Sequence, residues 1–140
     1  MIKPFEYRCE FKSSLDEVVS QIAKVISLLD SNFEIYNRFV LDLILRETLN
    51  NAVIHGNKNR PDQIIKLGLG IEADQFHIVV EDEGAGFNWQ SVIVQQTNPV
   101  HDHGRGFPIF QKYCNKIVLN KKGNRISLKL NVHKDIELDA

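Results

Sequence analysis

The segment from Leu45 to Gly56 constrains the fold most, because it has helical spacing yet sets polar side chains among apolar ones. The segment looks like the second half of a long helix. At about 100° per residue, apolar side chains gather on one side of that helix, namely Tyr36, Val40, Leu43, Ile44 and Ile54. Glu47 and Asn51 fall in the middle of that arc, one turn apart, and His55 follows a turn later. Burying a carboxylate beside an amide is costly unless both find partners. We therefore expect a polar ligand to meet the helix there, and a hydrated cation with a phosphate is a good candidate.

Length and composition limit the classes of protein to which this chain can belong. Its 140 residues suit one domain, over residues 1–140, with a core of its own. The 17 basic and 18 acidic residues are scattered, which argues against a surface for nucleic acid or an anionic membrane. The apolar runs fall short of the roughly 18 residues that a membrane span needs, and the N-terminus lacks the pattern of a leader. We therefore expect a cytoplasmic protein.

Periodicity and turn signals predict about five strands. They are expected at residues 5–11, 64–71, 76–80, 116–119 and 125–132. Strands and helices alternate irregularly, with two hairpins in place of regular crossovers. This arrangement favours a mixed, mostly antiparallel sheet with about three helices on one face. The expected fold class is a two-layer α/β (α+β) sandwich.

Two capping signals place the first two helices. Ser14 with Glu17 is a capping box, and it opens a helix that ends near residue 30. Ser31 with Glu34 repeats the signal and opens the longer helix. That helix should end at Gly56, where a glycine can take the left-handed conformation that closes a helix.

A glycine pair precedes the predicted third helix. Gly104 and Gly106 lie just ahead of Pro108, which suits a first helical turn because its missing N–H costs nothing there. Free N–H groups and the helix dipole make such a place an anion site, and Arg105 adds a positive charge. The same pattern also occurs at an ordinary junction of loop and helix, with a solvated arginine.

Asp82 ends a predicted strand, and Gly84 and Gly86 follow it. Glycines let a backbone approach a flat ligand closely, and a carboxylate can accept a hydrogen bond from the exocyclic amine of a base. Alternatively, Asp-x-Gly-x-Gly is an ordinary turn. Residues 88–103 show no lasting periodicity, and because loops of that length are usually functional or disordered we interpret this one as a lid.

The remaining potential metal or redox ligands do not form a motif. Cys9 and Cys114 lack paired spacing, so we interpret both as reduced thiols of the core. His101 and His103, with Asp102 between them, could suggest a metal. Two histidines one residue apart in a loop are more often solvated.

The order of these motifs resembles that of the GHKL (Bergerat-fold) ATPases. The order is a Glu-x-x-x-Asn helix (Glu47 and Asn51), a strand ending in Asp82-Glu83-Gly84-Ala85-Gly86, a long loop, and Gly104-Arg105-Gly106 at a helix start. The resemblance covers nearly the whole chain and includes Asn51-Ala52 followed by His55-Gly56. Within that superfamily, the compact chain is similar to the bacterial anti-sigma-factor serine kinases.

The resemblance implies a role for each matching residue. Asn51 would ligate Mg²⁺, and Glu47 would be the general base that takes a proton from a serine hydroxyl or water. Asp82 would accept from the adenine amine of ATP. The other implied nucleotide contacts are Gly84 and Gly86 at the base, and Gly104, Arg105, Gly106 and Phe107 at the phosphates, with His55 near them. Glu47 and Arg105 are the candidate catalytic residues.

Two functions are consistent with these motifs. The resemblance implies a serine kinase that binds a sigma factor and phosphorylates an antagonist protein, and two copies of the chain could pair through the first strand and helix. Some kinases of this kind carry an arginine just ahead of the last glycine pair, where this chain has His101-Asp102-His103. The alternative is therefore an ATP-dependent interaction module with little or no phosphoryl transfer. A domain whose glycines only make turns is the third hypothesis.

Overall fold

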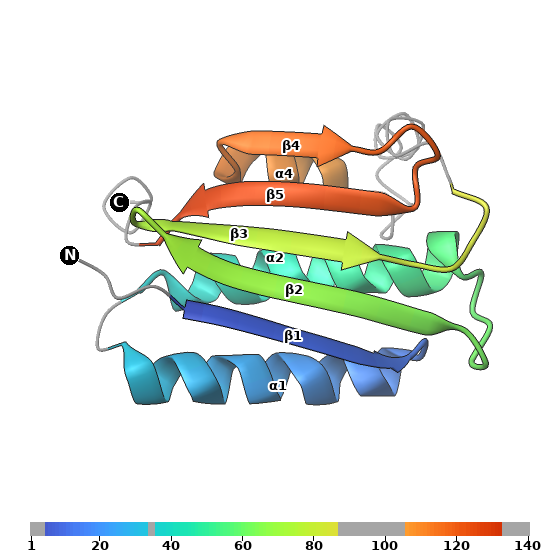
Figure 1. Cartoon of the computed structure of the whole chain (residues 1–140), viewed down its shortest axis with the longest axis horizontal. Helices are drawn as coiled ribbons and strands as arrows, with labels where there is room; N and C mark the ends of the chain where they lie inside the picture. The colour runs from blue at the N-terminus through green and yellow to red at the C-terminus, as the bar shows by residue number, and fades with distance from the viewer. Residues whose placement is uncertain (1–4, 34–35, 87–105, 133–140) are drawn as a thin grey trace.

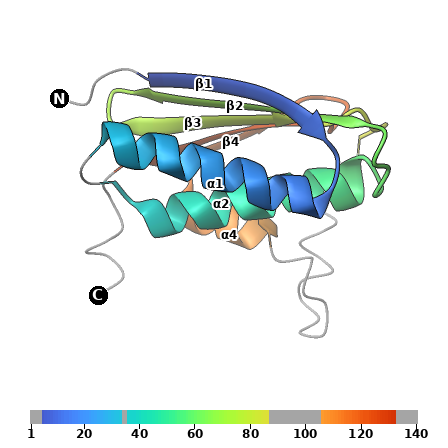
Figure 2. The same ribbon diagram turned by 90° about the horizontal axis from the view of Figure 1, so that it is seen from below.

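In the part of the chain that the structure describes, the protein forms a five-stranded sheet with helices packed against one face (Figures 1 and 2). The computed structural model describes residues 5–33, 36–86 and 106–132. The strands are β1 (Phe5–Lys12), β2 (Ile64–Glu72), β3 (Gln75–Glu81), β4 (Lys116–Leu119) and β5 (Arg125–Asn131). The helical elements are α1 (Leu15–Asn32), α2 (Arg38–Asn51), the π-helical turn η1 (Ala52–Gly56) and α4 (Gly106–Tyr113). The predicted two-layer sandwich is confirmed.

The sheet has the strand order β1-β2-β3-β5-β4, and every one of these pairings is antiparallel. We predicted a mixed sheet, and the described pairings are more regular than that. The reason is the place of β5. After α4 the chain returns as β4 in the same direction as β3, but β5 lies between the two and runs opposite to both.

The core lies between the sheet and the helices. Along β2 and β3 buried and outward side chains alternate, as a strand with one covered face requires. Residues Leu67, Leu69, Ile78 and Val80 are at most 2% exposed, and each such side chain contributes about 2 kcal/mol of hydrophobic free energy. Figure 2 shows α2 between α1 and α4 under the sheet.

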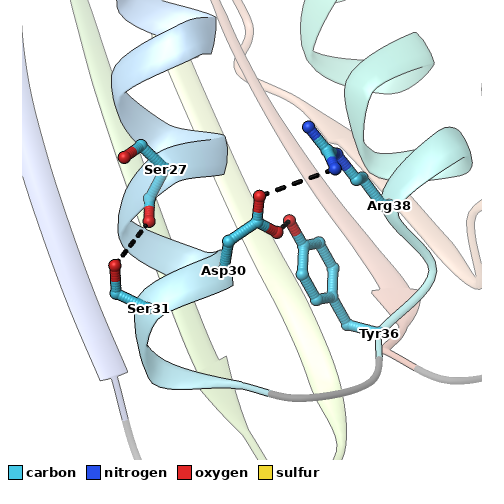
Figure 3. Close-up of polar contacts among 5 residues, drawn as sticks. All are labelled: Ser27, Asp30, Ser31, Tyr36 and Arg38. Carbon is cyan, nitrogen blue, oxygen red and sulfur yellow. Dashed lines mark hydrogen bonds and ion pairs between the residues drawn. The ribbon is translucent and has the colours of Figure 1, made fainter.

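The boundary between α1 and α2 differs from the sequence prediction. Ser31 does not cap the second helix; it lies in the last turn of α1, where its hydroxyl donates to the Ser27 carbonyl over 3.0 Å (Figure 3). The cap of α2 is Asn37, whose side-chain oxygen accepts from the Val40 amide at 3.3 Å. The Asn37 N–H itself donates to the Val132 carbonyl at 2.6 Å. That contact with the chain beyond β5 keeps residue 37 out of the helix.

Tyr36 joins the two helices across this boundary. Its hydroxyl donates to Asp30 Oδ1 over 2.8 Å, and Arg38 lies 3.6 Å from the other oxygen of Asp30 (Figure 3). The Tyr36 ring packs edge-on against Phe76. Burial and the Asp30 contact raise the pKa of the Tyr36 phenol, so the hydroxyl remains a donor. This cluster fixes the amino end of α2.

Candidate functional site

The carboxyl end of α2 carries the polar pair predicted from the sequence. The buried face of α2 is centred on Ile44, Leu45 and Thr48, and Asn51 lies on it with 2% exposure. Glu47 is half-buried at the margin of this face, so its predicted place at the centre of the apolar arc is wrong. The buried positions of α2 include Leu41, Leu45 and Leu49, so the covered face is centred away from Glu47. Glu47 is therefore nearer to solvent than Asn51.

The helix does not end as predicted, because α2 passes into the π-helical turn η1. The Asn57 N–H donates to the Ala52 carbonyl at 2.8 Å, five residues back. Gly56 is not left-handed; just beyond η1 the left-handed residues are Lys58 and Asn59, with φ of 52° and 60°. Gly56 is needed for another reason, since a Cβ there would overlap the carboxylate of Asp82. π-Turns within helices are often found at functional sites.

Asp82 directly follows β3 and is 4% exposed. Its Oδ1 accepts from the Gly84 amide at 2.8 Å. The pKa of this carboxyl is raised to about 6, chiefly by burial and to a lesser extent by Glu81, while the Gly84 amide and Lys122 act in the opposite direction. A buried carboxylate with one oxygen committed to a backbone amide retains acceptor capacity on the other oxygen.

The glycines after Asp82 allow three stretches of backbone to meet. A Cβ on Gly84 would overlap the Gly56 carbonyl, and a Cβ on Gly86 would overlap the Lys122 carbonyl. Gly86 also has a positive φ of 94°. The end of η1, the turn after β3 and the turn between β4 and β5 are thus packed backbone against backbone.

Asn57 and Asn124 hold this junction together, and the sequence analysis missed both. Asn57 is 1% exposed, its Oδ1 accepts from the Glu83 amide at 2.9 Å, and its Nδ2 donates to the Ile64 carbonyl at 3.3 Å. Asn124 accepts from the Asp82 amide at 2.9 Å through its backbone carbonyl and donates to the Asp82 carbonyl at 3.1 Å through its side chain. Asparagines in polar loops give no periodic signal, so only the fold reveals them.

The predicted phosphate end is described only in part. Gly106 is the first residue of α4, and the backbone of Phe107 lies in that helix. Because α4 leads directly into the start of β4, its amino end lies at the edge where β3 and α2 end (Figure 1). The rest of this predicted site lies outside the described residues. It comprises Gly104, Arg105 and the lid at residues 88–103, which includes His101-Asp102-His103.

Asn51 meets the physical test for a missing ligand. Its Nδ2 is buried, and in the described part of the chain it has no hydrogen-bond partner. Rotating the amide by half a turn would place its oxygen at the same point. The side chain could therefore either donate a hydrogen bond there through its nitrogen or ligate a cation through its oxygen. Mg²⁺ needs only one or two protein ligands when it is bound together with phosphates. Over the described ranges, no group of three or more His, Cys, Asp or Glu residues could hold a metal ion.

The family of this chain is defined by its match to a family model. Residues 13–130 match the family model of the histidine kinase-like ATPase domain, so the chain belongs to that family. Membership implies ATP as the bound nucleotide.

Several anti-sigma F factors are similar to this chain. The one from Geobacillus kaustophilus is 26% identical over 98 residues, which are 65% of this chain and 67% of the relative. The one from Clostridium novyi is 28% identical over 118 residues, which are 77% and 79% of the two chains. For two further Geobacillus anti-sigma F factors the match covers 59% of each protein.

A solved structure has a related fold. The histidine kinase domain of a blue-light activated histidine kinase from Erythrobacter litoralis matches with a TM-score of 0.50 and 17% identity. The match covers 84% of this chain but 60% of the kinase chain, so this protein spans about three fifths of that domain's length. The similarity supports the fold. In the described residues, the helices are too short or too polar to cross a membrane.

Proposed function

We propose that the protein is an ATP-dependent serine-protein kinase that acts as an anti-sigma factor. It would bind a sigma factor, and with Mg-ATP it would phosphorylate a serine of an antagonist protein. The relatives named anti-sigma F factors support the choice of partners. Because sigma factors act inside the cell, we propose a cytoplasmic location.

One observation carries this proposal. The carboxyl end of α2 carries the buried Asn51 Nδ2, which has no hydrogen-bond partner among the described residues, and Gly56 just beyond it lies directly against the buried carboxylate of Asp82. The residues proposed as cation ligand and base acceptor thus lie at the ends of two adjoining elements. Polar groups held in this way favour a ligand with a charged tail and a flat, amine-bearing base.

The position of each residue suggests its role. Asp82 would accept from the adenine amine, with Gly84 and Gly86 forming the wall of the base site. Asn51 would hold Mg²⁺, which screens the phosphate charge. Glu47, nearer to solvent at the margin of α2, would take the proton of the attacking serine. Gly104, Arg105, Gly106 and Phe107, with His55 near them, would bind the phosphates.

A matched pair of variants tests the kinase assignment. Glu47→Ala should keep ATP affinity within about threefold and lower phosphoryl transfer by at least about a hundredfold, because general bases contribute on the order of 10²–10⁴ in rate. Asn51→Ala should instead abolish the gain in ATP affinity that Mg²⁺ gives. Calorimetry with and without Mg²⁺ measures binding, and labelled ATP with candidate antagonists measures transfer. Unchanged transfer in the Glu47 variant would contradict the role of the base.

An interaction module is the second candidate, and the residues at the end of the lid favour it. His101-Asp102-His103 stands where some kinases of this kind carry an arginine. A module would bind ATP and change its affinity for a sigma factor without labelling any serine. The same Glu47→Ala variant decides between the two, since a module would keep full partner regulation and a kinase would lose turnover.

A further inference from the structure

The side chain of Asn57 joins the end of η1 to the turn that carries Asp82. We propose that Asn57 is a positioning residue for base recognition, which fixes the turn of Asp82, Glu83 and Gly84 against the end of η1. This inference rests on the proposed function, because it assigns Asp82 to the nucleotide base. Asn57 itself would touch no nucleotide.

Asn57 bridges three segments that are distant in the sequence. It follows η1 directly, and its two side-chain hydrogen bonds reach Glu83 after β3 and Ile64 at the start of β2. The Glu83 carboxylate accepts from the Ile64 amide in turn. At 1% exposure the Asn57 amide is shielded from water, and the hydrogen bonds of a buried, satisfied amide favour one geometry.

The amides of the turn show why Asn57 matters for Asp82. Three consecutive N–H groups have fixed acceptors: that of Asp82 donates to the Asn124 carbonyl, that of Glu83 to Asn57, and that of Gly84 to the Asp82 carboxylate. The middle bond is the one that ties the turn to the helix carrying Asn51. Without it, the carboxylate would remain tethered to Gly84 but the whole turn could shift relative to η1.

The close contact at Gly56 makes such a shift consequential. The Asp82 carboxylate lies so near Gly56 that not even a Cβ fits between them. Moving the turn changes the direction in which the remaining acceptor lone pairs point. A charge-assisted hydrogen bond depends strongly on direction, so the loss should fall on contacts with the base amine.

The test compares ATP with ITP, which has a carbonyl in place of the 6-amino group. At pH 8, where Asp82 is charged, the wild-type protein should prefer ATP by about tenfold or more, because a donor facing a carboxylate is replaced by an acceptor. Asn57→Ala should reduce this preference by about fivefold or more, mainly through weaker ATP binding. ITP affinity should change by less than about twofold.

Asn37→Ala is the matched control. Asn37 is also a buried asparagine, 5% exposed, but it caps the opposite end of α2, roughly 30 Å away along the helix. It should lower the thermal midpoint to a similar extent and leave the preference for ATP unchanged. If both variants lose stability and neither loses the preference, Asn57 is only a structural anchor and the proposal is overturned.

Two further measurements keep the outcomes separate. Failure of the wild-type protein to bind ATP would overturn the proposed function itself, whereas a wild-type preference that survives in Asn57→Ala would overturn only the role of Asn57. If the alanine variant does not fold, hydrogen exchange on the wild type decides. The Glu83 amide should be protected before nucleotide is added. Exchange at the rate of an unprotected amide would rule out the hydrogen bond by which Asn57 holds the turn.

Discussion

Asp82 gives the site a titration within an accessible pH range. Its pKa is raised from 3.8 to about 6, chiefly by burial. Because the folded pKa lies above the unfolded one, protonation favours the folded state. The contribution of Asp82 to stability is therefore fully present below pH 3.8 and is lost as the pH rises through about 6.

We expect urea unfolding to show this contribution. Between pH 4 and pH 7, the free energy of unfolding of the wild type should fall relative to that of Asp82→Asn by roughly 1–3 kcal/mol. The neutral amide removes the titration and keeps the shape of the side chain. Parallel pH profiles for the two proteins would show that Asp82 is not buried as described.

The sequence located some residues of the site and could not locate others. Asn51 stands out because it is a polar residue on a helix face that should be apolar, and Asp82 because it ends a strand and is followed by two glycines. Asn57 and Asn124 sit in loops that are polar throughout, so nothing in the sequence separates them from solvated neighbours. Their importance comes from contacts between segments that only the folded chain brings together.

At the level of elements, the sequence predicted well those helix and strand bounds that depend on neighbouring residues. The alternation of apolar residues gave the bounds of β2, β3 and β4 within about a residue, and the Ser14 hydroxyl caps α1 by accepting from the Glu17 amide at 3.1 Å. The predicted start of α2 was wrong, because Asn37 is held by a hydrogen bond to Val132, a residue far away in the sequence. The π-turn η1 was missed, since it depends on the junction that Asn57 builds.

Replacing a glycine by alanine should change the stability of the protein differently in the sheet and at the site. Gly84→Ala should destabilise the protein by about 2 kcal/mol or more, because its Cβ would meet the Gly56 carbonyl, a backbone group that cannot move aside. Gly68→Ala in β2 should be neutral or slightly stabilising, since its Cβ would lie 3.9 Å from that of Val79. Thermal unfolding of both variants measures the difference. Equal losses would show that tight packing at Gly84 is not the cause.

At the level of the whole molecule, pairing of two copies stays a prediction. β1 is an edge strand of the sheet, and a hollow between β1 and α1 is lined by Tyr7, Lys24 and Leu28, among others. Leu28 is 39% exposed there. An open strand edge beside an exposed leucine is a place where a second copy could bind.

Sedimentation of charged variants tests this surface. If the protein sediments as a dimer, Leu28→Glu should shift it toward the monomer, because a carboxylate would be buried without a partner. Val118→Glu is the control: Val118 is 46% exposed but lies on β4, at the other edge of the sheet. If the control dissociates the dimer and Leu28→Glu does not, the pairing surface lies at the β4 edge.

The backbone contact between Gly84 and Gly56 restricts how this domain can be re-engineered. Neither position offers a side chain to trim or enlarge, so a bulkier purine analogue cannot be accommodated by carving space on that side. On the other side of this turn, the backbone of Lys122 packs against Gly86, and the Lys122 side chain is exposed. If the base binds beside Asp82 as proposed, a variant that accepts a tagged nucleotide should be sought by varying Lys122, and the glycines should be left untouched.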